Sequence, residues 1–274
     1  MNKNHQQLAS EQQAEIAFSR QSPVFDIIYS HNKIIQYKRE RVRTHVNKYL
    51  NPNSNILELN SGTGEDAIYF AQQGHHVHAT DISVGMQNEL SIKVKKNELE
   101  NNISTELCSF TELTNLKYKG PYHLVFSNFA GLNCTNRLSD VLKDAEKLLV
   151  PGGIITIVLL PPFCLWETLQ ALRGQFKLAF RRFNSKNGVK AHIEGVYFTC
   201  WYYKPSFIIN EAKDKFDILD VEGLCTIVPP SYFEHFADKH PRAFKFLAKL
   251  ENRLKNKWPW KNVGDYYIIT LRKK

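Results

Sequence analysis

The stretch ILELNSGTGEDAIYF, residues 56–70, combines a short apolar run, two glycines and three acids. Gly62 and Gly64 would let the backbone approach a ligand closely, and the helix expected after them would direct free N–H groups to the same point. Asp81 follows Gly62 by 19 positions, the interval at which a carboxylate can receive the two ribose hydroxyls of an adenosine. The stretch therefore predicts a site for a nucleoside-containing cofactor.

Two kinds of cofactor fit the glycines taken alone. GTGEDA satisfies the dinucleotide pattern GxGxxG/A, so an NAD(P)-dependent oxidoreductase is one alternative. Glu58, inside the strand and four residues before Gly62, is unusual for a dinucleotide site, and the chain lacks an obvious Tyr-x-x-x-Lys hydride-transfer pair. A non-catalytic protein that binds an adenosyl ligand is a second alternative that the sequence leaves open.

The elements around these residues follow an alternating pattern. Residues 10–50 have helical spacing, and from NILELN to GIITIVLL short apolar strands alternate with helical stretches, which is typical of a parallel sheet with helices on both faces. Two stretches break the pattern, residues 161–215 with an expected hairpin in VKAHIEGVYFTCWYY, and residues 229–262. We expect a single domain over 1–274, with 1–50 as a helical cap, 51–160 as the cofactor-binding half and the two stretches as insertions on the substrate side.

With Glu58 in view, ELNSGTG resembles motif I, E/D-x-G-x-G-x-G, of the class I S-adenosylmethionine-dependent methyltransferases. ATDIS resembles their second motif, YHLVFSNFA the fourth, and LLVPGGIITIVLL the helix, turn and strand that follow. SNFAGLNC with the later PPFCLWE is similar to a bacterial, small-molecule subgroup. The resemblance implies an α/β, Rossmann-like, doubly wound fold, whose seven-stranded sheet is mostly parallel with an antiparallel last strand. It also implies S-adenosyl-L-methionine as cofactor and S-adenosyl-L-homocysteine as product.

The resemblance also implies roles for single residues. For the cofactor these are Glu58, Asn60, Gly62 and Gly64 at the methionine portion, Asp81 at the ribose, Ile82 and Phe110 at the adenine, and Asn128 beside the sulfonium. Arg41, or Tyr29 or Tyr37, would close the site from the N-terminal helices. Asn60 replaces a family glycine, and asparagine tolerates positive φ better than most residues. Ser109 replaces a common adenine-binding Asp.

The reaction implied is transfer of a methyl group by in-line displacement to a small, apolar or aromatic acceptor, with O-, N- or C-methylation unresolved. Asn133, Trp166 and Tyr202 in the irregular segments are the candidate acceptor contacts. His192 and Glu167 are the candidate proton acceptors. The segment after YHLVFS lacks the N-P-P-Y/F of enzymes that methylate base amines, which argues against nucleic acid as substrate.

Composition limits the other classes. The N-terminus has no apolar signal segment, the longest apolar run is residues 154–160, and five scattered cysteines lack CxxC spacing, so we expect a cytoplasmic protein without a spanning helix. HHVH at 75–78 does not complete a metal site. Of the net charge of +9, residues 231–274 contribute eight Lys and three Arg against four acids. The stretch 233–260 interleaves apolar and cationic residues and ends in two tryptophans, so peripheral membrane contact is one interpretation and a solvated basic helix face is the other. The oligomeric state is left open.

Overall fold

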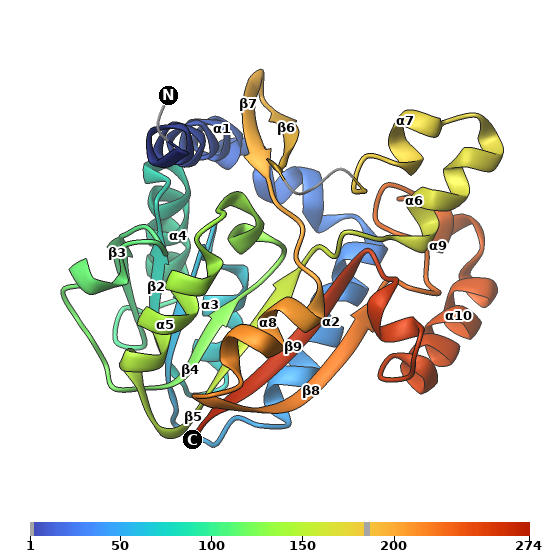
Figure 1. The fold of residues 1–274 in the computed structure, drawn as a ribbon. Coiled ribbons are helices and arrows are strands. Elements are labelled where there is room, and N and C mark those ends of the chain that lie inside the picture. The colour runs from blue at the N-terminus through green and yellow to red at the C-terminus, as the bar shows by residue number, and fades with distance from the viewer. Residues whose placement is uncertain (1–2, 184–186) are drawn as a thin grey trace.

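A seven-stranded sheet with the strand order β3-β2-β1-β4-β5-β9-β8 forms the centre of the molecule (Figure 1). The structure is a computed structural model that describes residues 3–183 and 187–274. β9 runs antiparallel to both of its neighbours, whereas β1 to β5 pair in parallel, so the expected fold class is confirmed. The strands are β1 (Asn55–Leu59), β2 (His76–Asp81), β3 (Ile103–Leu107), β4 (Tyr122–Ser127), β5 (Leu149–Leu159), β8 (Phe216–Leu224) and β9 (Tyr266–Lys273).

Helices cover both faces of the sheet because successive strand residues point to opposite sides. In β1, Ile56 packs into one core and Leu57 into the other. On the side of Ile56 lie α2 (Lys33–Asn47), α3 (Glu65–Gln72) and α4 (Val84–Lys96), and on the side of Leu57 lie α5 (Leu138–Leu148), α8 (Pro205–Ala212) and η1 (Leu113–Asn115). The central strands β1 and β4 are therefore buried on both sides, whereas the edge strand β3 is largely exposed.

The helix α1 (Lys3–Ser30) runs across the carboxyl ends of the strands, beside a two-stranded hairpin (Figure 1). The hairpin, β6 (Val189–Ile193) and β7 (Val196–Cys200), is the one that the alternation in VKAHIEGVYFTCWYY predicts. Ala14 and Ala17 of α1 pack against Val196 and Phe198 of β7. The hairpin thereby holds α1 over the edge of the sheet at which ligands of such folds bind.

Besides the hairpin and α8, the two irregular stretches form helical additions at the opposite end of the sheet from β3 (Figure 1). The first contains α6 (Leu165–Leu169), η3 (Gln170–Arg173) and α7 (Phe176–Ala179), and the second α9 (Phe236–Lys239), α10 (Pro241–Leu254) and η5 (Trp260–Asn262). A short 3-10 turn, η2 (Gly131–Cys134), follows β4. No helix within the described residues has the length and hydropathy needed to cross a bilayer. The division into cap, cofactor half and insertions stays a prediction.

Candidate functional site

A cavity lies where β1, β2 and β4 end, between these strands and α1. Seven of the nine residues expected at the cofactor line it, namely Glu58, Asn60, Gly62, Asp81, Ile82, Phe110 and Asn128. Helix α1 closes it through three contacts: Ser19 Oγ lies 2.7 Å from Ser83 Oγ, Thr63 donates to Asp26 at 2.7 Å, and Lys93 pairs with Asp26. The elements of the sheet and the N-terminal helix thus enclose one site.

The glycine turn after β1 has the backbone that its sequence requires. Gly62, at φ +55°, faces open space, since a Cβ there would have no described neighbour within 4 Å. Gly64, at φ +82°, begins α3 and does not line the cavity; a Cβ there would collide with Leu90. Asn60 adopts φ +46°, as its tolerance of that region predicts, and its side chain accepts from Ser127 Oγ and donates to the carbonyl of Asn128.

A second strained turn follows β4. Phe129 and Ala130 both have positive φ, 45° and 66°, which is rare for residues with bulky or unbranched apolar side chains and is found mainly at functional sites. Asn128 Oδ1 accepts from the Phe129 N–H at 2.8 Å, and its amide donates to Asp66 at 2.8 Å. These two hydrogen bonds hold the Asn128 side chain at the cavity wall.

Two buried carboxyl groups of the cavity have opposite protonation preferences. The Asp66 carboxylate accepts hydrogen bonds from Arg43 at 2.7 Å, from Arg39 at 3.4 Å and from the side-chain amide of Asn128. Burial alone would raise the pKa of Asp66, but Arg39, Arg43 and Asn128 outweigh burial and lower it. Glu58 is 3% exposed, and no described group donates a hydrogen bond to its Oε2. Burial, and next the negative charge of Asp66, raise its pKa well above the usual value. Arg39 and Arg43 offset only part of this effect, so Glu58 is a buried acid whose negative charge is poorly stabilised.

Asp81 connects the glycine turn to the start of α4. Its Oδ2 accepts from the Gly62 N–H at 2.9 Å and its Oδ1 from the Ser83 N–H at 2.8 Å. Burial raises the pKa of Asp81, and the N–H groups of Ser83 and Gly62 offset part of that effect. The carboxylate therefore already orders the turn and faces the same cavity as Glu58.

The charges that line the cavity are unbalanced. Five acids and one arginine contribute to its wall, namely Glu11, Glu58, Glu65, Asp66, Asp81 and Arg39. A site of this sign favours a ligand with positive charge and disfavours a pyrophosphate. The carboxyl groups of Glu58 and Asp81 and the first turn of α3 therefore face one enclosed space.

Arg39 lines the cavity, and Arg41, which was expected there, does not. Arg41 lies on the opposite side of α2, buried between β8 and α10, where it donates to Glu222 at 3.1 Å and to Glu251 at 3.2 Å. Residues two positions apart on a helix point in nearly opposite directions, so only one of the two arginines can face the site. Arg39 lines the cavity, with its guanidinium 5.3 Å from the Phe129 ring.

The three expected acceptor residues do not line this cavity. Asn133 is fully buried and serves the backbone, since it donates to the carbonyls of Leu160 and Trp201 and accepts from the Leu160 N–H. The ring of Trp166 lies 5.7 Å from that of Phe233, and the Tyr202 ring lies 5.3 Å from the guanidinium of Arg182. These side chains hold the insertions together.

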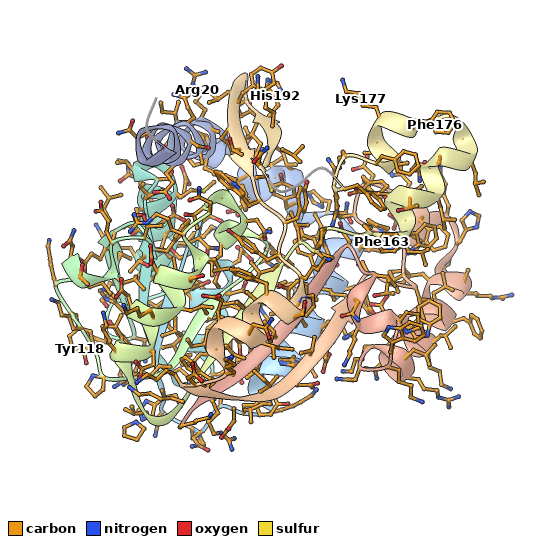
Figure 2. All side chains as sticks on the ribbon, in the orientation of Figure 1. Arg20, Tyr118, Phe163, Phe176, Lys177 and His192 are labelled. Carbon is orange, nitrogen blue, oxygen red and sulfur yellow. The ribbon has the colours of Figure 1, made fainter. Side chains whose placement is uncertain are left out.

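The two expected proton acceptors also lie elsewhere. His192 is exposed on the hairpin, where its ring lies 4.5 Å from that of Tyr197, and Figure 2 shows it at the outer end of the molecule near Arg20. Glu167 is buried and accepts hydrogen bonds from Arg181 and Arg182. Burial would raise the pKa of Glu167, but the two arginines outweigh it and lower the pKa. Neither residue is positioned to take a proton inside the cavity.

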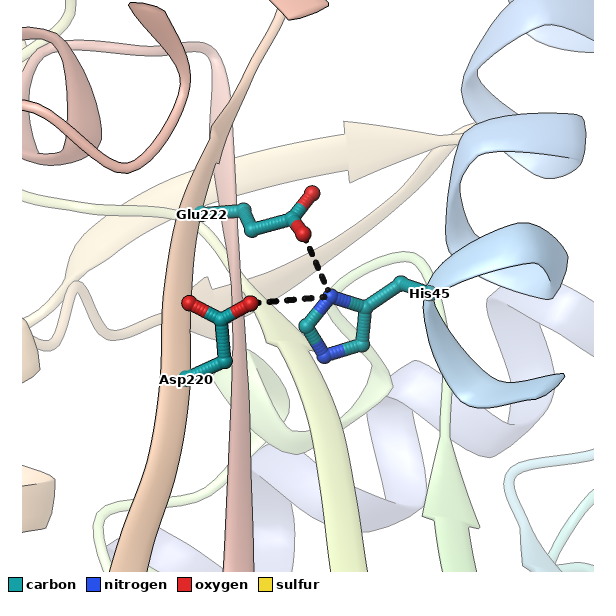
Figure 3. A group of neighbouring side chains, drawn as sticks. All are labelled: His45, Asp220 and Glu222. Carbon is teal, nitrogen blue, oxygen red and sulfur yellow. Dashed lines mark ion pairs between the residues drawn. The ribbon is translucent and has the colours of Figure 1, made fainter. Parts of the chain in front are cut away.

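Among the described residues, two clusters contain side chains of the metal-ligand type. In the first, His45, Asp220 and Glu222 converge (Figure 3). Glu222 also pairs with Arg41, with Lys48 at 2.7 Å and with Lys255 at 2.9 Å. Burial would raise the pKa of Glu222, but the contacts of His45 first, and then of Lys48 and Lys255, outweigh burial and lower it. In the second, Cys164 lies beside Glu167 and Asp265, which share Arg182. Both clusters are already neutralised by fixed positive charges, so we assign them to structural ion pairing.

Several cavity residues were not singled out from the sequence. These are chiefly Phe18 and Phe25 of α1, Arg39 of α2, and Asp66 of α3. Asp66 follows the two glycines directly, in SGTGED, and its place in the first turn of a helix could have indicated that it lies at the ligand site. For Phe18 and Phe25 the sequence offers none, because their position depends on how α1 docks onto the sheet.

Comparisons with known proteins agree with this geometry. Residues 56–153 match the family model described as "Methyltransferase domain". An S-adenosylmethionine-dependent methyltransferase assigned in Listeria monocytogenes superposes with a TM-score of 0.61 at 19% identity, over 89% of this chain and 99% of that one. The 1,6-didemethyltoxoflavin-N1-methyltransferase of Burkholderia thailandensis superposes with a TM-score of 0.59 at 14% identity, over 100% of this chain and 92% of that one. The [4+2]-cyclase SpnF superposes with a TM-score of 0.54 at 16% identity, over 85% of this chain and 80% of that one. Among curated proteins, no sequence matches this chain.

Proposed function

We propose that this chain, whose residues 56–153 match a methyltransferase domain, is a class I S-adenosylmethionine-dependent methyltransferase that transfers the methyl group to a small, apolar or aromatic acceptor. The sign of the charge in the cavity is the observation that carries the choice of cofactor. Of the five acids that line the cavity, Asp66 pairs with Arg39 and Arg43, and Glu65 pairs with Lys93. The buried carboxyl groups of Glu58 and Asp81 form no ion pair with a described residue, which suits a sulfonium and an ammonium group and opposes the two negative charges of a dinucleotide pyrophosphate. An oxidoreductase is therefore the weaker interpretation.

Individual residues fit the parts of this cofactor. Glu58 has a free buried oxygen that the ammonium group of the methionine portion would satisfy, and Arg39 offers a cation for its carboxylate. Asp81 would receive the ribose hydroxyls, and Ile82 and Phe110 would enclose the adenine. When bound, S-adenosylmethionine supplies an electrophilic methyl group. The protein's own contribution is to orient the acceptor beside Asn128 and to exclude water, which α1 does by covering the cavity.

The acceptor class follows from the apolar part of the enclosure. Phe18, Phe25 and Phe129 line the cofactor cavity. A second cavity of about 530 Å³ between α1, α2 and α3 shares Phe25, Arg39 and Glu65 with the first. It adds the apolar and aromatic side chains of Tyr29, Ile35 and Tyr69, beside polar and charged ones, namely Asp26, Ser30, Gln36, Glu40, Arg43 and Thr44. This volume falls in the range of about 300–1,000 Å³ that is typical of small-molecule sites. We propose that the acceptor enters there, on the α1–α2 side, instead of through the insertions.

The proposal is tested by calorimetric titration with S-adenosylhomocysteine and, in parallel, with NADH. Binding of the first alone supports the cofactor assignment, and binding of NADH alone would restore the oxidoreductase alternative. Because a cyclase shares this fold, turnover must be measured as well. Transfer of a labelled methyl group to phenols, quinones, amines or lipids would support the acceptor class, and tight binding without turnover on any acceptor would favour a non-catalytic protein.

Glu58→Gln is expected to stabilise the cofactor-free protein at pH 8 and to weaken cofactor binding. Because burial raises the pKa of Glu58 in the folded state above the unfolded value of about 4.3, its contribution to stability is complete below that value. It is lost as pH rises through the raised pKa. The amide introduced by the substitution stays neutral, so unfolding free energies of the variant, measured in urea from pH 5 to 9, should fall less steeply than those of the parent.

In the same variant, affinity for S-adenosylmethionine at pH 8 should fall about tenfold, because an amide cannot present the charge that the ammonium group requires. Calorimetry at pH 8 measures this loss. A variant that follows the parent's pH slope and binds with the parent's affinity would contradict the role given to Glu58.

A further inference from the structure

Residues 165–183, which comprise α6, η3 and α7, are called here the apolar lobe. Charged side chains are buried at its base, and large apolar side chains are exposed on its surface. Glu167 and Arg182 are almost completely buried at the base of the lobe. Glu167 accepts hydrogen bonds from both Arg181 and Arg182. Arg182 also donates a hydrogen bond to the Asp265 carboxylate at 2.8 Å. Ion pairs thus fix the lobe from inside, in the position that apolar side chains occupy in an ordinary helical unit.

The apolar side chains of the lobe face outward instead. Five of residues 169–183 are large, apolar and exposed: Leu169 42%, Leu172 85%, Phe176 61%, Phe180 50% and Phe183 56%. Figure 2 shows Phe176 on the side of α7 that faces away from the sheet, next to Lys177. Scattered exposed apolar residues are normal, but so many within fifteen positions mark a surface that is covered in use.

The charge around these side chains indicates what covers them. Arg173 and Lys177 are exposed among them, and Glu167, the one acid of residues 165–183, is buried in ion pairs. The lobe touches the second insertion through Trp166 and Phe233, whose rings lie 5.7 Å apart. At this end of the molecule α10 adds exposed cations, namely Arg242, Lys245, Lys249 and Arg253, beside an exposed Phe246 (Figure 1).

We propose that the apolar lobe docks on a membrane surface that contains anionic phospholipids. Leucine and phenylalanine side chains enter the boundary between headgroups and acyl chains, while arginine and lysine stay at the headgroups. A symmetric second copy fits less well, because a twofold interface would bring Arg173 and Lys177 against like charges. The proposal moves the main membrane contact from residues 233–260, where one interpretation of the sequence places it, to residues 165–183, with α10 as an electrostatic partner. It does not depend on the proposed methyl transfer.

The test is flotation of the whole protein with vesicles of phosphatidylcholine alone or of phosphatidylcholine with phosphatidylglycerol. The parent is expected to bind the second kind, and more weakly at high salt. Leu172→Glu with Phe176→Glu should weaken binding at least about tenfold, because two apolar contacts are lost and two repelled charges are added. Ile92→Glu on α4, also a change at an exposed apolar residue, is the matched control and should bind like the parent.

Lys177→Glu, which keeps all the apolar side chains, should also reduce binding to the anionic vesicles and show that charge contributes. Equal binding to both kinds of vesicle, or unchanged binding by the Leu172 and Phe176 variant, would overturn the proposal. Sedimentation velocity provides the other decisive outcome. A parent dimer that the Leu172 and Phe176 variant abolishes would assign the lobe to a second copy of this chain and overturn membrane docking.

Discussion

Arg41→Met is expected to lower the free energy of unfolding by about 3 kcal/mol and to leave the affinity of the folded protein for S-adenosylhomocysteine unchanged. Arg41 joins α2 to β8 and α10, since it donates to Glu222, Glu251 and the Tyr37 hydroxyl. Methionine fills a similar volume but leaves two buried carboxylates with one cation fewer. The loss is limited because Glu222 keeps Lys48 and Lys255.

Glu251 explains why the network reaches beyond one ion pair. Its side chain is fully buried and accepts backbone N–H groups of four successive residues, 225–228, which form the loop after β8. Arg41 is thus one of several donors that hold this carboxylate in place. Chemical denaturation followed by circular dichroism measures the stability change, and calorimetry at a temperature where the variant is folded measures the affinity.

Arg39→Met is the matched variant on the opposite side of the same helix. It should weaken binding of S-adenosylhomocysteine by about 1–2 kcal/mol, because a charge-assisted hydrogen bond to the ligand carboxylate is lost. Its effect on folding should be small, since Asp66 retains Arg43 and Asn128. If Arg41→Met instead lost affinity at full stability, Arg41 would return to the cofactor site and Arg39 would be the structural residue.

The exchange between these two arginines shows what the sequence could predict. The parallel strands and the glycine turn were predictable, because apolar runs with period 2 and a Gly-x-Gly after a strand report local geometry. In α2, the apolar residues Ile34, Val42 and Val46 are buried, and by helical phase Arg41 lies close to Ile34 whereas Arg39 lies close to Val46. The phase of these apolar residues therefore does not separate the two arginines. Arg41 is distinguished by its partners Glu222 and Glu251, which come from distant parts of the chain.

The acceptor side could not be predicted in the same way. Trp166 and Tyr202 lie in irregular segments whose packing is set by contacts with Phe233 and Arg182, far along the chain. Asn133 looked like a substrate contact because it is polar and follows β4, yet the backbone of residues 160 and 201 uses its whole amide. Composition cannot distinguish a polar side chain that satisfies buried backbone from one that meets a ligand.

Asp81→Ala is expected to weaken binding of S-adenosylhomocysteine by about 3 kcal/mol, a loss of more than about a hundredfold. The carboxylate would form charged hydrogen bonds with the ribose, and it also holds the Gly62 and Ser83 N–H groups that shape the turn. Calorimetric titration measures the loss. Asp217→Ala, a change at an exposed acid on β8, is the control and should bind like the parent.

Asp81→Asn separates the two roles of the side chain. Its amide oxygen can still accept from one backbone N–H, so the turn should be largely kept, but the charge that strengthens the ribose hydrogen bonds is gone. If charge dominates, as we expect in this buried position, the asparagine variant will lose nearly as much affinity as the alanine variant. Near-parental affinity in Asp81→Asn would show that Asp81 acts by shaping the turn, and near-parental affinity in both variants would remove Asp81 from the cofactor site.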